Sequence, residues 1–132
     1  MTPVARAKHS INKLRNESRG HAFFNMAELD EGQVTRLVEA LNAPDAHLNE
    51  LSFSNSTIAP NGLKRILQTL KHYQLTALEF CAHDFSQHTD EEFVELASVT
   101  GAATIRRFDQ VGVSFPILNA GFMSLGYVHI DS

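Results

Sequence analysis

The sequence predicts an α/β solenoid, a right-handed βα superhelix with a parallel sheet of about five strands on the concave side and helices on the convex side. Two observations predict this fold class. Segments 48–58 and 75–85 place large apolar residues at the same first, fourth, sixth and eleventh positions. Amphipathic helical patterns also recur, at nearly the same spacing along the chain as these segments. Two independent features that repeat at one period indicate a repeat architecture.

The strand-like segments carry the first of these features. The first segment places Leu48, Leu51, Phe53 and Ile58 at the four positions, and the second places Leu75, Leu78, Phe80 and Phe85. A third, weaker copy at 105–115 keeps Ile105, Phe108 and Phe115 but has Gln110 at the sixth position. We expect Leu51, Leu78 and Phe108 to lie side by side as successive rungs of one hydrophobic ladder.

A helical pattern precedes or follows each strand-like segment, with apolar residues at i, i+3, i+4 and i+7. The three stripes are Val34, Leu37, Val38 and Leu41; Leu63, Ile66, Leu67 and Leu70; and Phe93, Leu96 and Ala97. Asp30-x-x-Gln33 and Thr89-x-x-Glu92 have the form of capping boxes, which satisfy free backbone N–H groups at a helix start. Helices of this length form the crossovers that parallel strands need.

The two ends of the chain predict the domain organisation. Residues 1–18 form a basic segment that we interpret as a helical cap, and residues 19–132 form the repeat domain. Counting back from the first helix gives a first unit with Ala22, Phe24 and Leu29 inside. At the other end, the spacing of Phe122, Leu125, Tyr127 and Ile130 predicts a truncated closing unit. If the ends of the stack stay open, two chains could pair there as a homodimer.

Composition and charge limit the function classes. The chain has 132 residues with a net charge of −4 and a single cysteine, Cys81, so no intrachain disulfide can form and a reducing, cytoplasmic setting is expected. No Sec-type signal is visible, although export as an effector stays open. Residues 1–20 carry five basic residues and one acidic residue. We interpret them as a solvated helix attracted to an acidic body, and expect neither a membrane nor a nucleic acid as partner.

The segments 48–58, 75–85 and, imperfectly, 105–115 resemble the leucine-rich repeats, whose hallmark is LxxLxLxxN/CxL. Units of this length, completed by real helices, look like the ribonuclease-inhibitor-like subclass. In that family the ninth position usually carries Asn or Cys, whose side chain bonds neighbouring backbone. Here it carries Ser56, His83 and Val113. Ser and His can supply a polar group and Val cannot, so we expect the third copy to have the most degraded ladder.

The resemblance implies binding of a protein through the concave sheet face. Carried over by position, the partner-binding residues are Phe23, Asn25, Glu50, Ser52, Ser54, Glu79, Cys81, Arg107, Asp109 and Val111. This row is mixed and mildly acidic, which favours a partner with some basic and some apolar character. The expected function is a protein–protein interaction module, such as an adaptor, an assembly factor or a bacterial effector.

Two other functions stay open as alternatives. One is a small α/β regulatory domain of the anti-sigma-antagonist type, switched by phosphorylation of Ser54 or Ser56. The other is an enzyme that uses Cys81 with His83. The histidines and aspartates at His83, Asp84, His88 and Asp90 invite a metal site, but structural roles are simpler for them. Because the chain has no phosphate-binding, zinc-ligating or nucleophile-elbow motif, we expect no catalysis, no metal and no cofactor.

Overall fold

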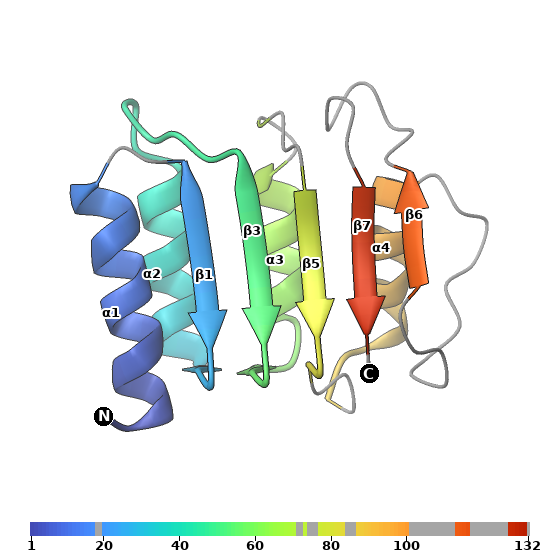
Figure 1. The fold of residues 1–132 in the computed structure, drawn as a ribbon, viewed down its shortest axis with the longest axis horizontal. Helices are drawn as coiled ribbons and strands as arrows, with labels where there is room; N and C mark the ends of the chain where they lie inside the picture. Colours follow the sequence, from blue (N-terminus) through green and yellow to red (C-terminus); the bar gives the residue numbers. More distant parts are fainter. Residues whose placement is uncertain are drawn as a thin grey trace.

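The computed structural model describes residues 1–17, 20–70, 73, 77–83, 87–100, 113–116 and 127–131. Within them the chain has a mixed α/β fold, with a largely parallel sheet in front of a row of helices (Figure 1). The sheet has the strand order β1-β3-β5-β7-β6. Its strands are β1 (His21–Asn25), β3 (Glu50–Ser54), β5 (Ala77–Cys81), β7 (Tyr127–Asp131) and β6 (Val113–Pro116). A separate two-stranded parallel sheet pairs β2 (Glu28–Leu29) with β4 (Thr57–Ile58).

The strands β1, β3 and β5 pair in the register that the sequence repeat predicts. Leu51 lies opposite Leu78, and Phe53 lies between Phe24 and Phe80. The three rings stack with centroids 5.1 and 5.5 Å apart and interplanar angles of 14° and 13°. All are at most 1% exposed. Each such ring pair contributes about 1 kcal/mol beyond its burial, so the phenylalanine stack ties neighbouring units together.

The helices α2 (Glu31–Leu41), α3 (Gly62–Thr69) and α4 (Asp90–Thr100) form the second layer, behind the sheet in Figure 1. The predicted stripes of α2 and α3 are buried, except that Val38 is only partly buried. Gly62 lets α3 approach α2 closely, because a Cβ there would lie 2.8 Å from methyl groups of Val34 and Ile58. The helix layer therefore packs directly on the previous unit. The pattern residues Leu75 and Phe85 lie outside the described residues.

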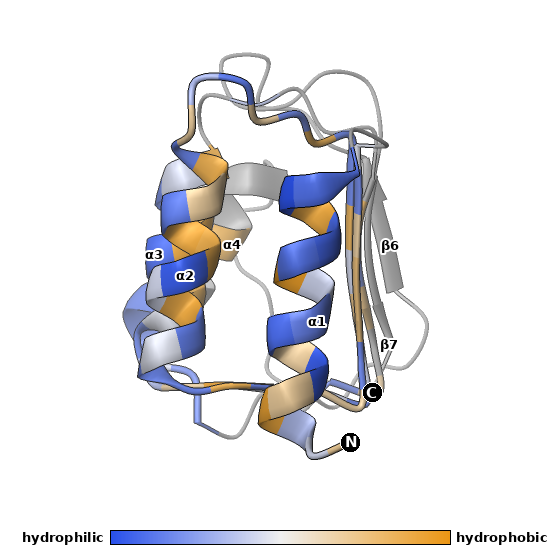
Figure 2. Cartoon of the chain, turned by 90° about the vertical axis from the view of Figure 1, so that its left-hand side faces the viewer, coloured by the Kyte–Doolittle hydropathy of each residue, from blue (hydrophilic) through white to orange (hydrophobic). Residues whose placement is uncertain are grey.

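The helix α1 (Pro3–Asn16) covers the β1 end of the core. It stands across the space between the sheet and α2, with a mostly hydrophilic outer surface (Figure 2). Thr2 caps its start through a hydrogen bond from the Ala5 N–H, 3.1 Å long. Ala7 and Ile11 face the core and are fully buried. This helix therefore closes the apolar interior that the first unit would otherwise expose.

A left-handed residue follows each of the first three parallel strands. These residues are Met26 after β1, Asn55 after β3 and Ala82 after β5, with φ between 49° and 52°. The conformation turns the chain sharply from the sheet toward the helix layer. Asn adopts it readily, whereas a residue such as Met or Ala is strained there by about 1–2 kcal/mol. The turn is thus imposed by the packing of the units and not by the local residue type.

The end of the sheet departs from the prediction. The copy at 105–115 was expected beside β5, but β5 pairs with β7, which places Val128 opposite Leu78. Val113, at the third ninth position, begins the antiparallel edge strand β6. Phe108 lies outside the described residues. Only residues 117–126 join β6 to β7, and parallel pairing needs a crossover of about a dozen residues or more. The expectation that all five strands run parallel is therefore wrong at this edge.

Candidate functional site

The outer face of the sheet, on the side away from α2, α3 and α4, is the candidate functional site (Figure 1). Along β1 the residues alternate between exposed and buried, and along β3 between half-buried and buried. The register aligns the outward positions of neighbouring strands. Phe23 lies beside Ser52, which lies beside Glu79. Within the described residues no helix covers these positions.

The structure describes most of the predicted row. Solvent reaches the side chains of Phe23, Asn25, Glu50, Ser52, Ser54 and Glu79. Cys81 is placed only by its backbone, which is paired with Ser54 at the end of β5. The remaining predicted residues, Arg107, Asp109 and Val111, lie outside the described residues. Six of the ten predicted residues therefore share one solvent-accessible face of β1, β3 and β5.

An aromatic and ionic group marks the β1 end of this face. The Phe23 side chain is 54% exposed, unusually high for phenylalanine. The His21 ring packs edge-on against it, with centroids 5.5 Å apart and an interplanar angle of 73°. His21 Nδ1 also lies 3.9 Å from Glu50 Oε2, so it pairs with that carboxylate when protonated. The sequence prediction left out His21, although strand alternation from Phe23 could have found it.

A groove separates this face from α1. Its lining comprises Ser10, Lys13 and Glu17 from the α1 side and His21 and Phe23 from β1. The Ser10 hydroxyl donates a 2.8 Å hydrogen bond to the Phe23 carbonyl oxygen. That bond satisfies one acceptor on the open edge of β1 and fixes α1 against the strand. The sequence gives no local signal for this groove, because it arises from tertiary contact.

The helix α1 is rich in cationic side chains. Its four basic residues are Arg6, Lys8, Lys13 and Arg15, and it contains no carboxylate. Within the described residues none of the four forms an ion pair. The helix is held instead by the burial of Ala7 and Ile11. An Arg36 guanidinium also donates a 3.0 Å hydrogen bond to Asn12 in α1.

The corner after β3 is organised by Ser56, at the ninth repeat position. Its side chain is 1% exposed. The hydroxyl oxygen accepts a 3.1 Å hydrogen bond from the Ala27 N–H, and the hydroxyl lies 2.8 Å from the Ser54 carbonyl oxygen, to which it donates. Ser56 therefore supplies the backbone-directed polar group that the resemblance implies for this position.

The corner after β5 holds His83 at the equivalent position. The ring is 4% exposed and lies against Phe53 and Phe80, with centroid distances of 5.7 and 5.3 Å. Its Nε2 lies 2.9 Å from Nε2 of His88, a hydrogen bond in which one ring donates and the other accepts. The planes of the two rings are nearly parallel, at 9°. His83 therefore bonds to another side chain at a position where Ser56 bonds to backbone.

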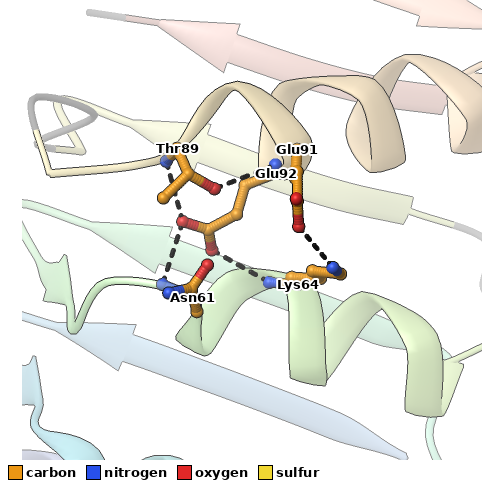
Figure 3. A network of polar contacts seen from close by, with 5 residues as sticks. All are labelled: Asn61, Lys64, Thr89, Glu91 and Glu92. Carbon is orange, nitrogen blue, oxygen red and sulfur yellow. Dashed lines mark hydrogen bonds and ion pairs between the residues drawn. The ribbon is translucent and has the colours of Figure 1, made fainter.

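Glu92 links this corner to two helix starts, as Figure 3 shows. Thr89 and Glu92 form the predicted capping box of α4, with bonds of 3.0 and 3.3 Å. The same carboxylate accepts hydrogen bonds from the N–H groups of Asn61 and Lys64 at the start of α3, at 3.1 and 2.9 Å. Asn61 is the N-cap of α3 but makes no side-chain cap bond. One carboxylate therefore caps two consecutive helices.

The hydrogen bonds keep Glu92 ionised in the interior. The side chain is fully buried, and burial alone would raise its pKa. The nearby His88 ring and the hydrogen bonds from the Thr89 N–H and the Lys64 N–H outweigh burial and lower the pKa of Glu92 to about 2. His88 Nδ1 lies 3.4 Å from Glu92 Oε1. Nearby, the ammonium group of Lys64 forms a 2.5 Å ion pair with Glu91 and lowers the pKa of that exposed carboxylate.

The described residues also bear on the alternatives of serine phosphorylation, metal binding and membrane crossing. Ser56 is buried and bonded to backbone, so a kinase could reach only Ser54 of the two serines without local opening. In the part of the chain that the structure describes, no three His, Cys, Asp or Glu residues come together around a metal position. Asp84 and the side chain of Cys81 lie outside that part. None of its helices combines the length and the apolar composition that crossing a bilayer requires.

Comparison of the chain with protein-family models, with curated proteins and with solved structures finds no match.

Proposed function

We propose that the chain is a short module of the leucine-rich-repeat type that binds a protein partner through the outer face of its sheet. One observation carries the proposal. The outward positions of β1, β3 and β5 align in rows, and the row at Phe23 starts from an aromatic side chain that is 54% exposed. Exposed aromatic residues at a face of this kind are typical anchors of protein interfaces.

The structural role of the opposite layer supports this choice of face. The helices α2 and α3 bury their apolar stripes, α4 buries Leu96, and polar contacts join the three helices. Arg65, for example, donates a 3.2 Å hydrogen bond to Thr35. The outer sheet face carries half-buried hydroxyls and carboxylates that are not needed for such packing. It is therefore the surface best able to accept a partner without loss of the fold.

A capture experiment with matched variants tests the proposal. Phe23→Ser removes the exposed ring from the sheet face, and Val94→Ser removes a 68% exposed side chain from α4. Both changes delete an exposed apolar side chain, so both should reduce non-specific hydrophobic adsorption of other proteins. Each protein is immobilised, and the proteins captured from a native lysate are quantified by mass spectrometry.

We expect a defined partner to be captured by the wild type and by Val94→Ser, and reduced at least ten-fold by Phe23→Ser, because interface anchors cost about 2 kcal/mol or more when truncated. A partner that is lost with Val94→Ser and kept with Phe23→Ser would place the binding surface on the helix layer and contradict the proposal. Circular dichroism of both variants checks that the fold is intact.

A further inference from the structure

Two buried histidines meet in the corner after β5. His83 is 4% exposed and His88 is 3% exposed, and their Nε2 atoms lie 2.9 Å apart. Because a hydrogen bond needs one donor and one acceptor, one of these Nε2 atoms carries a proton and the other does not. The contact therefore limits how many protons the two rings can hold together.

The closed pair can hold one proton beyond its neutral form, and not two. A neutral imidazole has one N–H group, and an imidazolium has two. If one ring is charged, its Nε2–H still donates to the unprotonated Nε2 of the other ring. If both rings are charged, two Nε2–H groups face each other at 2.9 Å and repel. This limit concerns the two Nε2 atoms, so it holds whatever the Nδ1 atoms contact.

The contacts of the pair favour a single positive charge. His88 Nδ1 lies 3.4 Å from Oε1 of Glu92, and a charge on His88 is therefore neutralised by that carboxylate. On the sheet side, the His83 ring lies against Phe53 and Phe80. These two rings provide no counter-ion for a second charge, and burying a charge without a counter-ion is unfavourable.

The other described charges of α3 and α4 lie further out. Asp90 and Glu91 are exposed at the start of α4, and Glu95 is half-buried one turn further on. From α3, the ammonium group of Lys64 pairs with Glu91. Among the described residues, Glu92 is therefore the carboxylate that pairs with the two rings.

Glu92 also connects the histidine pair to the preceding unit. Its carboxylate accepts hydrogen bonds from the N–H groups of Asn61 and Lys64 at the start of α3, as Figure 3 shows. The same carboxylate completes the capping box of α4. A movement that separates His83 from His88 therefore acts on the residue that joins the starts of two helices.

We propose that the His83–His88 pair is a pH-sensitive switch, in which a second proton separates the two rings, opens the corner after β5 and loosens the hold of Glu92 on α3. The open corner can hold two protons and the closed corner only one, so acid favours opening. An unperturbed histidine takes up its proton near pH 6.5, which places the opening just below about pH 6.5.

The switch acts at a higher pH than the protonation of Glu92. The hydrogen bonds to Glu92 lower the pKa of that carboxyl group to about 2, so it stays ionised in the closed corner between pH 6 and pH 5. A change of structure within this interval therefore reports on the histidine pair.

Amide hydrogen exchange of the full chain tests the switch at individual bonds. The Asn61 and Lys64 N–H groups report on the Glu92 corner. The Ala27 N–H, which donates to the Ser56 hydroxyl, reports on the other corner. Protection factors, corrected for the intrinsic exchange rate at each pH, are measured by NMR at pH 6 and at pH 5.

Three variants accompany the wild type. In His83→Gln and His88→Gln, the amide can still form a hydrogen bond to the remaining ring but does not titrate. His9→Gln is the matched control, because it removes an exposed histidine from α1. The two corner variants are made separately, so that one serves as the test if the other does not fold.

We expect the protection of the Asn61 and Lys64 N–H groups to fall about five-fold or more from pH 6 to pH 5, in the wild type and in His9→Gln, because opening takes up about one net proton. The protection of the Ala27 N–H should change less than about two-fold, because opening is local. Neither corner variant should show the fall, because each keeps one ring and the closed corner holds one proton.

Unchanged protection of the Asn61 and Lys64 N–H groups in the wild type overturns the inference. A corner variant that keeps the whole fall overturns it as well, because the titrating group then lies elsewhere. An equal fall at the Ala27 N–H would show that acid unfolds the whole chain and not one corner, which also contradicts the switch. The wild-type result decides by itself if both corner variants fail to fold.

Discussion

The corners that follow β3 and β5 occupy the same place in the repeat but use different chemistry. Ser56 joins two units because its hydroxyl accepts a bond from the Ala27 N–H and donates to the Ser54 carbonyl oxygen. His83 fills its corner with a ring packed against Phe53 and Phe80, and its bond to His88 leads on toward the carboxylate of Glu92. Among the described residues, the hydrogen-bond partners of Ser56 are all backbone groups, so none of them is ionisable. The second corner makes the packing of its unit depend on a buried charge.

The helix starts show the same contrast. Both α2 and α4 begin with a capping-box sequence. Asp30 caps α2 by accepting a 2.9 Å bond from the Gln33 N–H, but the Gln33 side-chain oxygen is buried and makes no hydrogen bond within the described residues. Glu92 completes its box and also caps α3. A capping-box motif therefore determines the hydrogen bond at its own helix start. Whether the same side chain also bonds to a neighbouring unit depends on how the units pack.

The largest effect should come from removal of the buried charge. Glu92→Gln keeps the size of the side chain but weakens the bonds to two helix starts, and should lower the free energy of unfolding by about 3 kcal/mol. Gln33→Ala, at the matching position of α2, should change it by less than about 0.5 kcal/mol. Urea unfolding of both variants measures the difference. Equal losses would remove the contrast between the two helix starts.

Lowering the pH should destabilise the fold through the Glu92 corner and not through the Ser56 corner. Because the pKa of Glu92 is lowered from 4.5 to about 2, its contribution to stability is complete above pH 4.5 and is lost as the pH falls toward 2. The loss is on the order of 3 kcal/mol, at 1.36 kcal/mol per pH unit. Urea unfolding between pH 6 and pH 2 measures it against Glu92→Gln. If the variant keeps the full acid sensitivity of the wild type, Glu92 is not its source.

The Ser56 corner should respond to truncation and not to pH. Ser56→Ala leaves the buried Ala27 N–H without its acceptor and should cost about 1–2 kcal/mol. Ser54→Ala, on the solvent side of the same segment, should cost less than about 0.5 kcal/mol. Thermal unfolding at pH 7 compares them. The Ser56→Ala loss should be the same at pH 4, and a marked pH dependence would show an ionisable partner at this corner.

The smallest effect concerns the turns that lead into the corners. Ala82→Asn should stabilise the chain by about 0.5–1 kcal/mol, because Asn tolerates the left-handed conformation that Ala82 adopts. Asn55→Ala should destabilise it by a similar amount at the equivalent turn. Chemical unfolding of both variants tests the pair, and changes of the same sign would show that backbone strain does not set these turns.

The sequence predicted those features that each unit encodes locally. Leu51 and Leu78 pair as their shared repeat position requires, and Thr89 with Glu92 forms the expected box. Three features depend on contacts between distant segments and were not predicted. They are the reach of Glu92 to α3, the groove between α1 and β1, and the pairing of β7 with β5. The connection between β6 and β7 is visibly too short in the sequence for a full helix, which agrees with their antiparallel pairing, but the residue pattern did not indicate that β7 would lie beside β5.

Hydroxyl-radical footprinting of the chain, free and bound to a captured partner, tests most directly whether the outer sheet face is the binding surface. Phe23 and Val94 are both well exposed and lie on opposite layers of the fold. Binding at the sheet face should suppress oxidation of Phe23 several-fold and leave oxidation of Val94 unchanged. Protection of Val94 with undiminished oxidation of Phe23 would contradict the account.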